Sequence, residues 1–154
     1  MTLLAIDPGP EQSAWLVFAD GQPRSFGIWP NDELLCFRLG PPSWDLVVIE
    51  QVTSYGMPVG REVFETVRWS GRFEQAASPI RVEYLPRLAV KLALCHSPKA
   101  NDATIRQALL DRFGGSKAVG TKKAPGPLHG IHRDVWSALA LAVAWQEREA
   151  ERVA

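Results

Sequence analysis

The chain has 154 residues, a length typical of one domain that buries about two thirds of its unfolded surface. Hydrophobic residues make up 46% and charged residues 22%, as in a soluble globular protein, and the longest apolar run, residues 138–145, is too short to span a bilayer. The net charge is zero, but residues 1–80 contain five basic and ten acidic residues, whereas residues 81–123 contain nine basic and three acidic. This asymmetry is typical either of a polyanion-binding protein with an acidic, cation-collecting centre or of a solvated helix face.

The first part of the chain reads as an antiparallel meander. Residues 3–7 are four apolar residues that end in Asp7 and are followed by Pro8 and Gly9, which predicts a buried strand and a turn. Asp20 and Gly21 form a hairpin signal between the apolar segments 13–19 and 24–29. Three neighbouring antiparallel strands are therefore expected.

A short helix and a second acid-terminated strand follow the meander. Asn31 is predicted to cap a helix with acidic residues in its first turn, and residues 40–42 (Gly-Pro-Pro) should end it. Residues 45–50 repeat the opening pattern, because an apolar strand ends in Glu50. No basic and apolar leader precedes the first strand, and Cys36 and Cys95 match no metal-binding spacing, so we expect no signal peptide and a reducing cytoplasm.

The remainder alternates helices with one strand. We expect a helix over residues 60–77, a strand over 80–85, helices over 87–94 and 100–113, and a last helix from about residue 132. Residues 117–127 are rich in Gly, Pro and Lys and predict a mobile basic loop. The whole pattern favours an α/β fold class with a single domain over residues 1–154.

Three acidic residues are candidates for a shared metal site. Asp7 and Glu50 end two strands, and Asp134 lies in the first turn of an apolar helix. Mg²⁺ prefers oxygen ligands from several elements, and two ions about 4 Å apart can activate a water and stabilise a leaving oxygen. Taken alone, Asp7 also suits a turn and Asp134 also suits a helix dipole, whereas Glu50 is an awkward end to an apolar strand.

The segments LLAIDPG, DLVVIEQV and HRDVWSALALA, with a basic helical region between the last two, resemble the RuvC family of Holliday junction resolvases, especially its short phage-type members. The resemblance covers nearly the whole chain and depends on the order and spacing of these segments. It implies a ribonuclease H-like fold with a central mixed five-stranded sheet flanked by helices. It also implies a homodimer that cuts four-way DNA junctions with Mg²⁺ or Mn²⁺, two ions per site, in the cytoplasm of a bacterial cell. The small size favours a phage gene.

Within this resemblance, Asp7, Glu50 and Asp134 match metal-binding carboxylates of the family. The family carries a further Asp three positions after the third ligand, where this chain has Ser137, a weak metal ligand. Either the three carboxylates suffice or His132 helps to complete the site; on its own, His132 reads as a capping or surface residue.

Lys99, in SPKANDATIRQALL, resembles the basic residue that precedes this helix in phage-type members. The resemblance implies that it contacts a phosphate near the bond that is cut; an ordinary solvated lysine is the alternative.

Further DNA contacts are expected on both sides of the candidate site. Tyr55 and Met57, in the loop over residues 51–59, are candidates to insert at the junction centre, although an exposed turn tyrosine explains Tyr55 equally well. The helix over residues 60–77 is the expected dimer face. Contacts to the DNA backbone are expected from basic residues on this helix and after it: Arg61, Arg68, Arg72, Lys91, Lys99, Arg106, Lys117, Lys122 and Lys123.

The expected function is therefore a metal-dependent endonuclease that resolves four-way junctions by paired symmetrical nicks. One alternative is a nuclease of the same fold that acts on other branched DNA or on RNA–DNA hybrids. A second is a catalytically silent junction-binding module, which the departure at Ser137 favours. A nucleotide-binding actin-like or kinase-like domain would need a Gly-rich phosphate loop after the first strand, and residues 8–11 (Pro-Gly-Pro-Glu) match one poorly.

Overall fold

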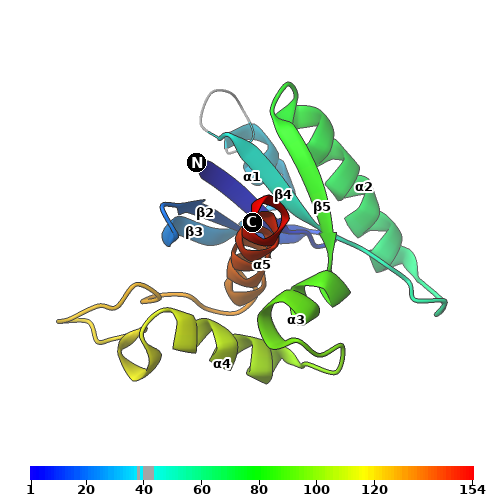
Figure 1. Cartoon of the computed structure of the whole chain (residues 1–154). Coiled ribbons are helices and arrows are strands. Elements are labelled where there is room, and N and C mark those ends of the chain that lie inside the picture. Colours follow the sequence, from blue (N-terminus) through cyan, green and yellow to red (C-terminus); the bar gives the residue numbers. More distant parts are fainter. Residues whose placement is uncertain (38, 40–43) are drawn as a thin grey trace.

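The computed structural model describes residues 1–37, 39 and 44–154, and its centre is one mixed five-stranded sheet (Figure 1). The strand order is β3-β2-β1-β4-β5. Strand β2 runs antiparallel to both β1 and β3, whereas β1, β4 and β5 run parallel to one another. This confirms the predicted α/β class with a mixed five-stranded sheet. The strands are β1 (Thr2–Asp7), β2 (Gln12–Ala19), β3 (Gln22–Pro30), β4 (Leu46–Gln51) and β5 (Arg81–Pro86).

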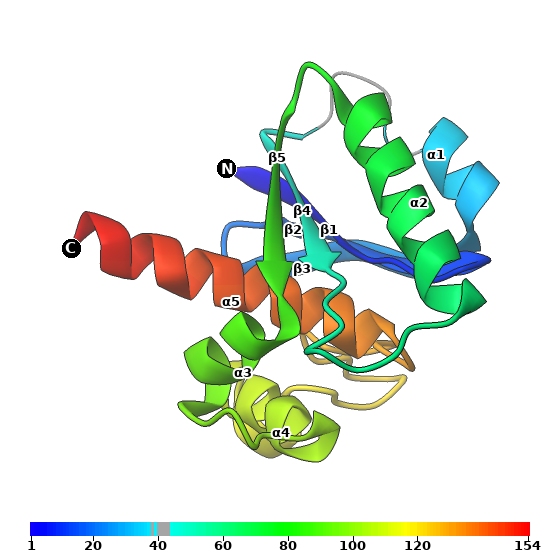
Figure 2. The same ribbon diagram turned by 90° about the vertical axis from the view of Figure 1, so that its right-hand side faces the viewer.

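Helices cover both faces of the sheet (Figure 2). On one face lie α1 (Asn31–Phe37) and α2 (Arg61–Ala77). On the other, α5 (Val135–Val153) packs on β1 and β2, and α3 (Arg87–Cys95) and α4 (Asp102–Arg112) pack beside it. A 3-10 turn, η1 (Gly115–Lys117), follows α4.

Strand β1 is apolar throughout because it is buried on both faces. Leu4 and Ile6 belong to the core cluster under α1 and α2, whereas Leu3 and Ala5 belong to the cluster under α5. Side chains alternate along a strand, so the next residue, Asp7, projects toward the α5 side. The four alanines of α5 that are fully buried let this helix lie close to the sheet: Ala138, Ala140, Ala142 and Ala144.

One predicted boundary differs from the structure. The last helix begins at Val135, after the predicted start near residue 132, so Asp134 is its N-cap and lies ahead of the first turn. The loop over residues 117–127 contains backbone hydrogen bonds between Gly126 and Val119 and between Thr121 and Ala124, and its mobility stays a prediction. The predicted helix stop at residues 40–42 lies outside the described residues. Within the described ranges, each helix falls short of the length and apolar character that a membrane span requires.

Candidate functional site

Asp7 and Glu50 meet at one edge of the sheet. Strands β1 and β4 are parallel neighbours, and Ile6 pairs with Ile49. The next residue in each strand is the acid, so Asp7 and Glu50 lie side by side. Glu50 lies two residues after Val48, which is in the core cluster under α5, and therefore projects to the same face as Asp7. The predicted pairing of the two strand-terminal acids is a direct consequence of the parallel register.

The two carboxyl groups are close enough to share a proton. Burial, a hydrogen bond with Glu50 and the negative charges of Glu50 and Asp134 together raise the pKa of Asp7 to about 9. A protonated Asp7 can donate to Glu50, whose side chain is only 17% exposed. The pair at the strand ends therefore carries one proton and one negative charge at neutral pH.

Asp134 approaches this pair from the start of α5. It is exposed, and the residue before it, Arg133, has φ 47°, a left-handed conformation in which the chain turns sharply into the helix. Its charge contributes to the raised pKa of Asp7. Among the described residues, however, no three His, Cys, Asp or Glu side chains already stand in an arrangement that could hold a metal ion.

A buried polar network fixes the turn that follows Asp7. The Gly9 N–H donates to the Ser13 hydroxyl (3.1 Å), which donates to Oδ1 of Asn31 (2.6 Å), and Nδ2 of Asn31 donates to the Gly9 carbonyl (2.9 Å). A Cβ at Gly9 would lie 2.4 Å from the carbonyl oxygen of Gln12, so the turn requires glycine. Asn31 was predicted as a helix cap; its side chain instead holds the loop beside Asp7, which sequence reasoning did not reveal.

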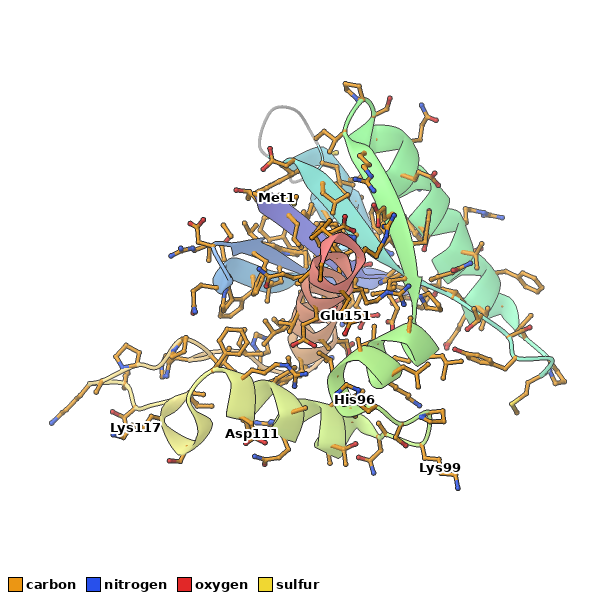
Figure 3. All side chains as sticks on the ribbon, in the orientation of Figure 1. Met1, His96, Lys99, Asp111, Lys117 and Glu151 are labelled. Atoms are coloured by element: carbon orange, nitrogen blue, oxygen red, sulfur yellow. The ribbon has the colours of Figure 1, made fainter. Side chains whose placement is uncertain are left out.

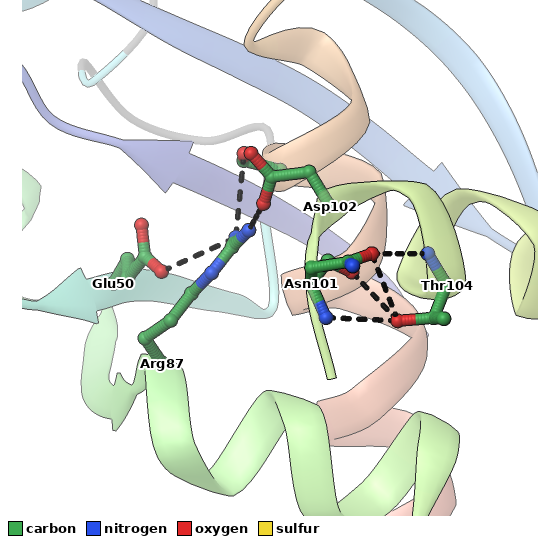
Figure 4. Close-up of polar contacts among 6 residues, drawn as sticks. Glu50, Arg87, Asn101, Asp102 and Thr104 are labelled. Carbon is green, nitrogen blue, oxygen red and sulfur yellow. Dashed lines mark hydrogen bonds and ion pairs between the residues drawn. The ribbon is translucent and has the colours of Figure 1, made fainter. Parts of the chain in front are cut away.

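Arg87 is the site residue that sequence reasoning missed (Figure 4). Its guanidinium lies 3.6 Å from Oε1 of Glu50, donates to the Ser137 hydroxyl at 3.4 Å and pairs with Asp102. A signal was available, because β5 runs parallel to β4 and Glu50 pairs with Leu85. A basic residue two positions after Leu85 must therefore lie at the same sheet edge as the acids.

Three hollows meet at these side chains. One of about 400 Å³ is lined by Arg87, Asp134 and Ser137, together with Arg106 and Arg133. Asp134 also lines a second hollow of about 800 Å³, beside the Gly9 turn and the start of α2. A third, of about 240 Å³, is lined by Glu50, Tyr55 and Arg87. Asp134 and Arg87 thus each line two of the hollows, and Glu50 lines one.

His132 and Lys99, both expected near the metal site, lie elsewhere. The ring nitrogen Nδ1 of His132 contacts the Gly130 carbonyl oxygen at 2.8 Å, and the residue is exposed. Lys99 is exposed in the loop between α3 and α4, where it points away from the sheet (Figure 3) and lines a separate hollow with Thr104. The structure therefore brings neither side chain to the carboxylates.

The loop over residues 52–60 extends away from the sheet edge (Figure 1). At its tip Tyr55 is 63% exposed and Met57 71% exposed, and Tyr55 adopts φ 50° next to Gly56. Such a turn presents two large side chains to solvent at the mouth of the hollow that Glu50 lines.

The remaining predicted DNA-binding residues lie on two sides of the site. On α2, Arg68 pairs with Glu65 at 3.4 Å and Arg72 stacks 3.9 Å from the centroid of the Trp69 ring. On the other side, Arg106 stacks 4.5 Å from the centroid of Trp136. Lys91 is half-buried on α3, whereas the other four are exposed: Arg61, Lys117, Lys122 and Lys123.

Known structures share this architecture, although no protein-family model and no curated protein sequence matches the chain. A structure of Thermus thermophilus RuvC is 17% identical and aligns over 98% of this chain and 96% of its own length, with a TM-score of 0.66. T. thermophilus RuvC in complex with a Holliday junction substrate is 19% identical, with coverages of 97% and 94% and a TM-score of 0.65.

The chain has a RuvC-like fold.

The donor set at these strand ends suits a hard divalent cation. Asp7 and Glu50 supply adjoining carboxylate oxygens, and Asp134 lies within electrostatic reach of them. Burial and the neighbouring acids keep a proton on Asp7, and Arg87, 3.6 Å from Glu50, offsets only part of the negative charge; a divalent ion would supply further positive charge by displacing the shared proton. Ser137, on the next turn of α5, contributes only a neutral hydroxyl that already accepts a hydrogen bond from Arg87.

Proposed function

We propose that this protein is a metal-dependent endonuclease that resolves four-way (Holliday) DNA junctions by paired, symmetrical nicks. The observation that carries the proposal is the adjoining pair Asp7 and Glu50, which stands at the strand ends of a RuvC-like sheet and whose negative charge Arg87 offsets only in part. The solved complex of T. thermophilus RuvC with a Holliday junction substrate supports the choice of branched DNA over other nucleic acids.

The proposed cofactor is Mg²⁺ or Mn²⁺, held by Asp7, Glu50 and Asp134. When bound, such an ion activates water and neutralises charge that develops on a phosphate. The protein's part is to hold the DNA strand so that the phosphate and the attacking water are correctly oriented. The oxygen of the water bonds to phosphorus and becomes part of a 5′-phosphate, the P–O3′ bond breaks, and a proton ends on the departing 3′ oxygen.

Two features of the surface support a DNA-bound homodimer. On α2, Phe64 is 63% exposed and Val67 50% exposed, three residues apart on one side of the helix, a placement suited to pairing with a second copy. Arg61, Arg68 and Arg72 lie on the same helix and would follow the backbone of DNA bound across the dimer. Two sites related by a twofold axis would produce symmetrical cuts on opposite strands.

The test uses a labelled four-way junction, a linear duplex and an RNA–DNA hybrid, each with Mg²⁺ or with chelator. Only the junction should be nicked in pairs, and only with the metal. The variants D7N and E50Q should bind the junction and cut none of it, whereas D111N, which changes an exposed acid on α4, should cut normally. Cleavage of the hybrid in preference to the junction would contradict the proposed substrate.

A catalytically silent junction-binding module is the second candidate. It is favoured by Ser137, where the resemblance leads us to expect a carboxylate, and by Arg87, which neutralises part of the acidic pair. This candidate predicts that the unmodified protein binds junctions tightly yet leaves them intact in both Mg²⁺ and Mn²⁺. Any paired nicking that chelator abolishes and D7N removes would exclude it.

A further inference from the structure

We propose that Arg87 takes the place of a second metal ion in this site. The chain would then bind one divalent cation and use the Arg87 guanidinium to hold the phosphate that is cut. The proposal deepens the proposed nuclease function and rests on it, and it departs from the two ions per site that the family resemblance implies.

The first support is the position of the guanidinium among the ligands. It spans Glu50 on one side (3.6 Å) and the Ser137 hydroxyl on another (3.4 Å), so it lies between a carboxylate and the position where a further carboxylate is expected. Ser137 follows Asp134 by three residues on α5, which places both side chains on one face of the helix. A cation therefore already stands between the ligands that a second ion would need.

The second support is the balance of charge. Ionised Asp7, Glu50 and Asp134 carry a total of −3, and one divalent ion with Arg87 carries +3. A second divalent ion would leave an excess of +2 near a neutral hydroxyl, a poor ligand for a hard cation. The charge of Arg87 acts on this cluster, since its guanidinium lies 3.6 Å from Oε1 of Glu50.

The third support is the partner that Arg87 has on its solvent side. Asp102, at the start of α4, pairs with Nη2 of Arg87 while its own side chain is 90% exposed. A planar guanidinium binds carboxylate and phosphate oxygens in the same forked manner, so Asp102 occupies the place that a phosphate would take. Because Asp102 is so exposed, a DNA phosphate can displace it by a rotation of one surface side chain.

The hollows offer a path along which a DNA strand could reach Arg87. Arg87 lines both the hollow that contains Asp134 and Ser137 and the one that contains Glu50 and Tyr55. A backbone that passes from one to the other crosses the guanidinium. Arg106 and Arg133 line the first hollow and would attract the neighbouring phosphates.

The decisive experiment counts bound metal ions without DNA. Mn²⁺ is titrated into the full-length protein and followed by calorimetry and by the electron paramagnetic resonance signal of free Mn²⁺. The unmodified protein should bind one Mn²⁺ per chain, and R87Q should bind its first Mn²⁺ about tenfold more tightly, because a neighbouring positive charge is gone. Two ions per chain in the unmodified protein, or none, would overturn the proposal.

Ser137 offers a gain-of-site test. In S137D the new carboxylate should pair with Arg87, and the count should stay at one. In the double variant R87Q/S137D the cation is removed and the ligand restored, so two Mn²⁺ per chain are expected. A count of two in S137D alone would show that Arg87 does not exclude the second ion. Far-UV circular dichroism and thermal unfolding verify that each variant is folded.

The phosphate contact is tested by cleavage of the four-way junction under single-turnover conditions. R87Q should cut about a hundredfold more slowly, as expected when one donor to a developing charge is lost, and R87K should recover only part of the rate. The matched control is R112Q: the Arg112 side chain is 28% exposed, against 25% for Arg87, and it also pairs with a glutamate, Glu147, at a distance from the acids. Equal rates for R87Q and R112Q would remove Arg87 from the reaction.

The outcomes separate this proposal from the proposed function. A protein that cuts junctions and binds two Mn²⁺ keeps the nuclease function and loses the role of Arg87. A protein that binds one Mn²⁺ and cuts nothing loses the nuclease function and the phosphate contact, while the replacement of the second ion stands.

Discussion

Asp7 should destabilise the metal-free protein at neutral and alkaline pH, and the substitution D7N should remove that effect. Burial and the neighbouring acids raise the pKa of Asp7 from 3.8 to about 9. In the unfolded chain the carboxyl group loses its proton near its ordinary pKa, whereas in the folded protein it keeps the proton to much higher pH. The folded state therefore binds more protons over this interval, and the free energy of unfolding falls as pH rises from about 4 to about 9.

The rise of about 5 pKa units, at 1.36 kcal/mol each, sets a ceiling of about 7 kcal/mol on the loss. Asp7 is only partly buried, so solvent screening reduces this figure, and we expect about 2 kcal/mol between pH 5 and pH 9. Asparagine has the same shape and can donate to Glu50 as the protonated acid does. D7N should therefore match the unmodified protein at pH 4.5 and exceed its free energy of unfolding by about 2 kcal/mol at pH 9.

Urea unfolding in chelator, followed by circular dichroism at several pH values, measures this difference. The control is D32N, which changes an exposed acid on α1 and should leave the pH profile of stability unaltered. The reasoning is refuted if D7N and the unmodified protein differ by a constant amount at every pH, or if D7N is the less stable of the two at pH 9.

Three further predictions concern the turn at Gly9, Lys99 and α2. N31A should lower the free energy of unfolding by about 2 kcal/mol, because it leaves the buried Ser13 hydroxyl without its acceptor and the part-buried Gly9 carbonyl without its donor. A loss no larger than that of a substitution at an exposed site would contradict the network. K99A should reduce the salt dependence of junction binding by about one counterion, and an unchanged slope would remove Lys99 from the backbone contacts. F64E should convert a dimer into a monomer in sedimentation velocity, because it charges an exposed apolar side chain; an unmodified protein that is itself monomeric excludes the dimer.

The fold and the acidic pair could be predicted because both depend on local patterns. An apolar run too short for a helix must be a strand, and side chains alternate along it, so the faces of β1 follow from the segment LLAID alone. Parallel strands bring their carboxyl ends to one edge, so Asp7 and Glu50 meet wherever the two strands are neighbours. The first inference needs no knowledge of distant contacts, and the second needs only the pairing of β1 with β4.

The polar contacts around the pair could not be predicted in the same way. Arg87 and Ser137 are 50 residues apart and Ser13 and Asn31 are 18 apart, and each pair meets through the packing of separate elements. Asn31 stands where a helix cap is common, so the local pattern favoured the wrong partner. The position of Asp134 relative to its helix was also predicted wrongly. The sequence places Asp134 inside the helix, whereas Arg133 turns the chain and leaves Asp134 at the helix boundary.

Asp7 and Arg87 would change partners in different ways when the proposed site binds metal and DNA. A proton on Asp7 and the guanidinium of Arg87 both offset the negative charge of the acids when metal is absent. In the proposed function a divalent cation displaces that proton, whereas Arg87, held also by Ser137 and Asp102, can stay in place. The proposal therefore has the proton and the metal compete for Asp7, while Arg87 exchanges one acidic partner, Asp102, for a phosphate. A site built in this way keeps one fixed positive charge in every state, which is why the count of metal ions, more than the rate of cleavage, distinguishes it from a site with two ions.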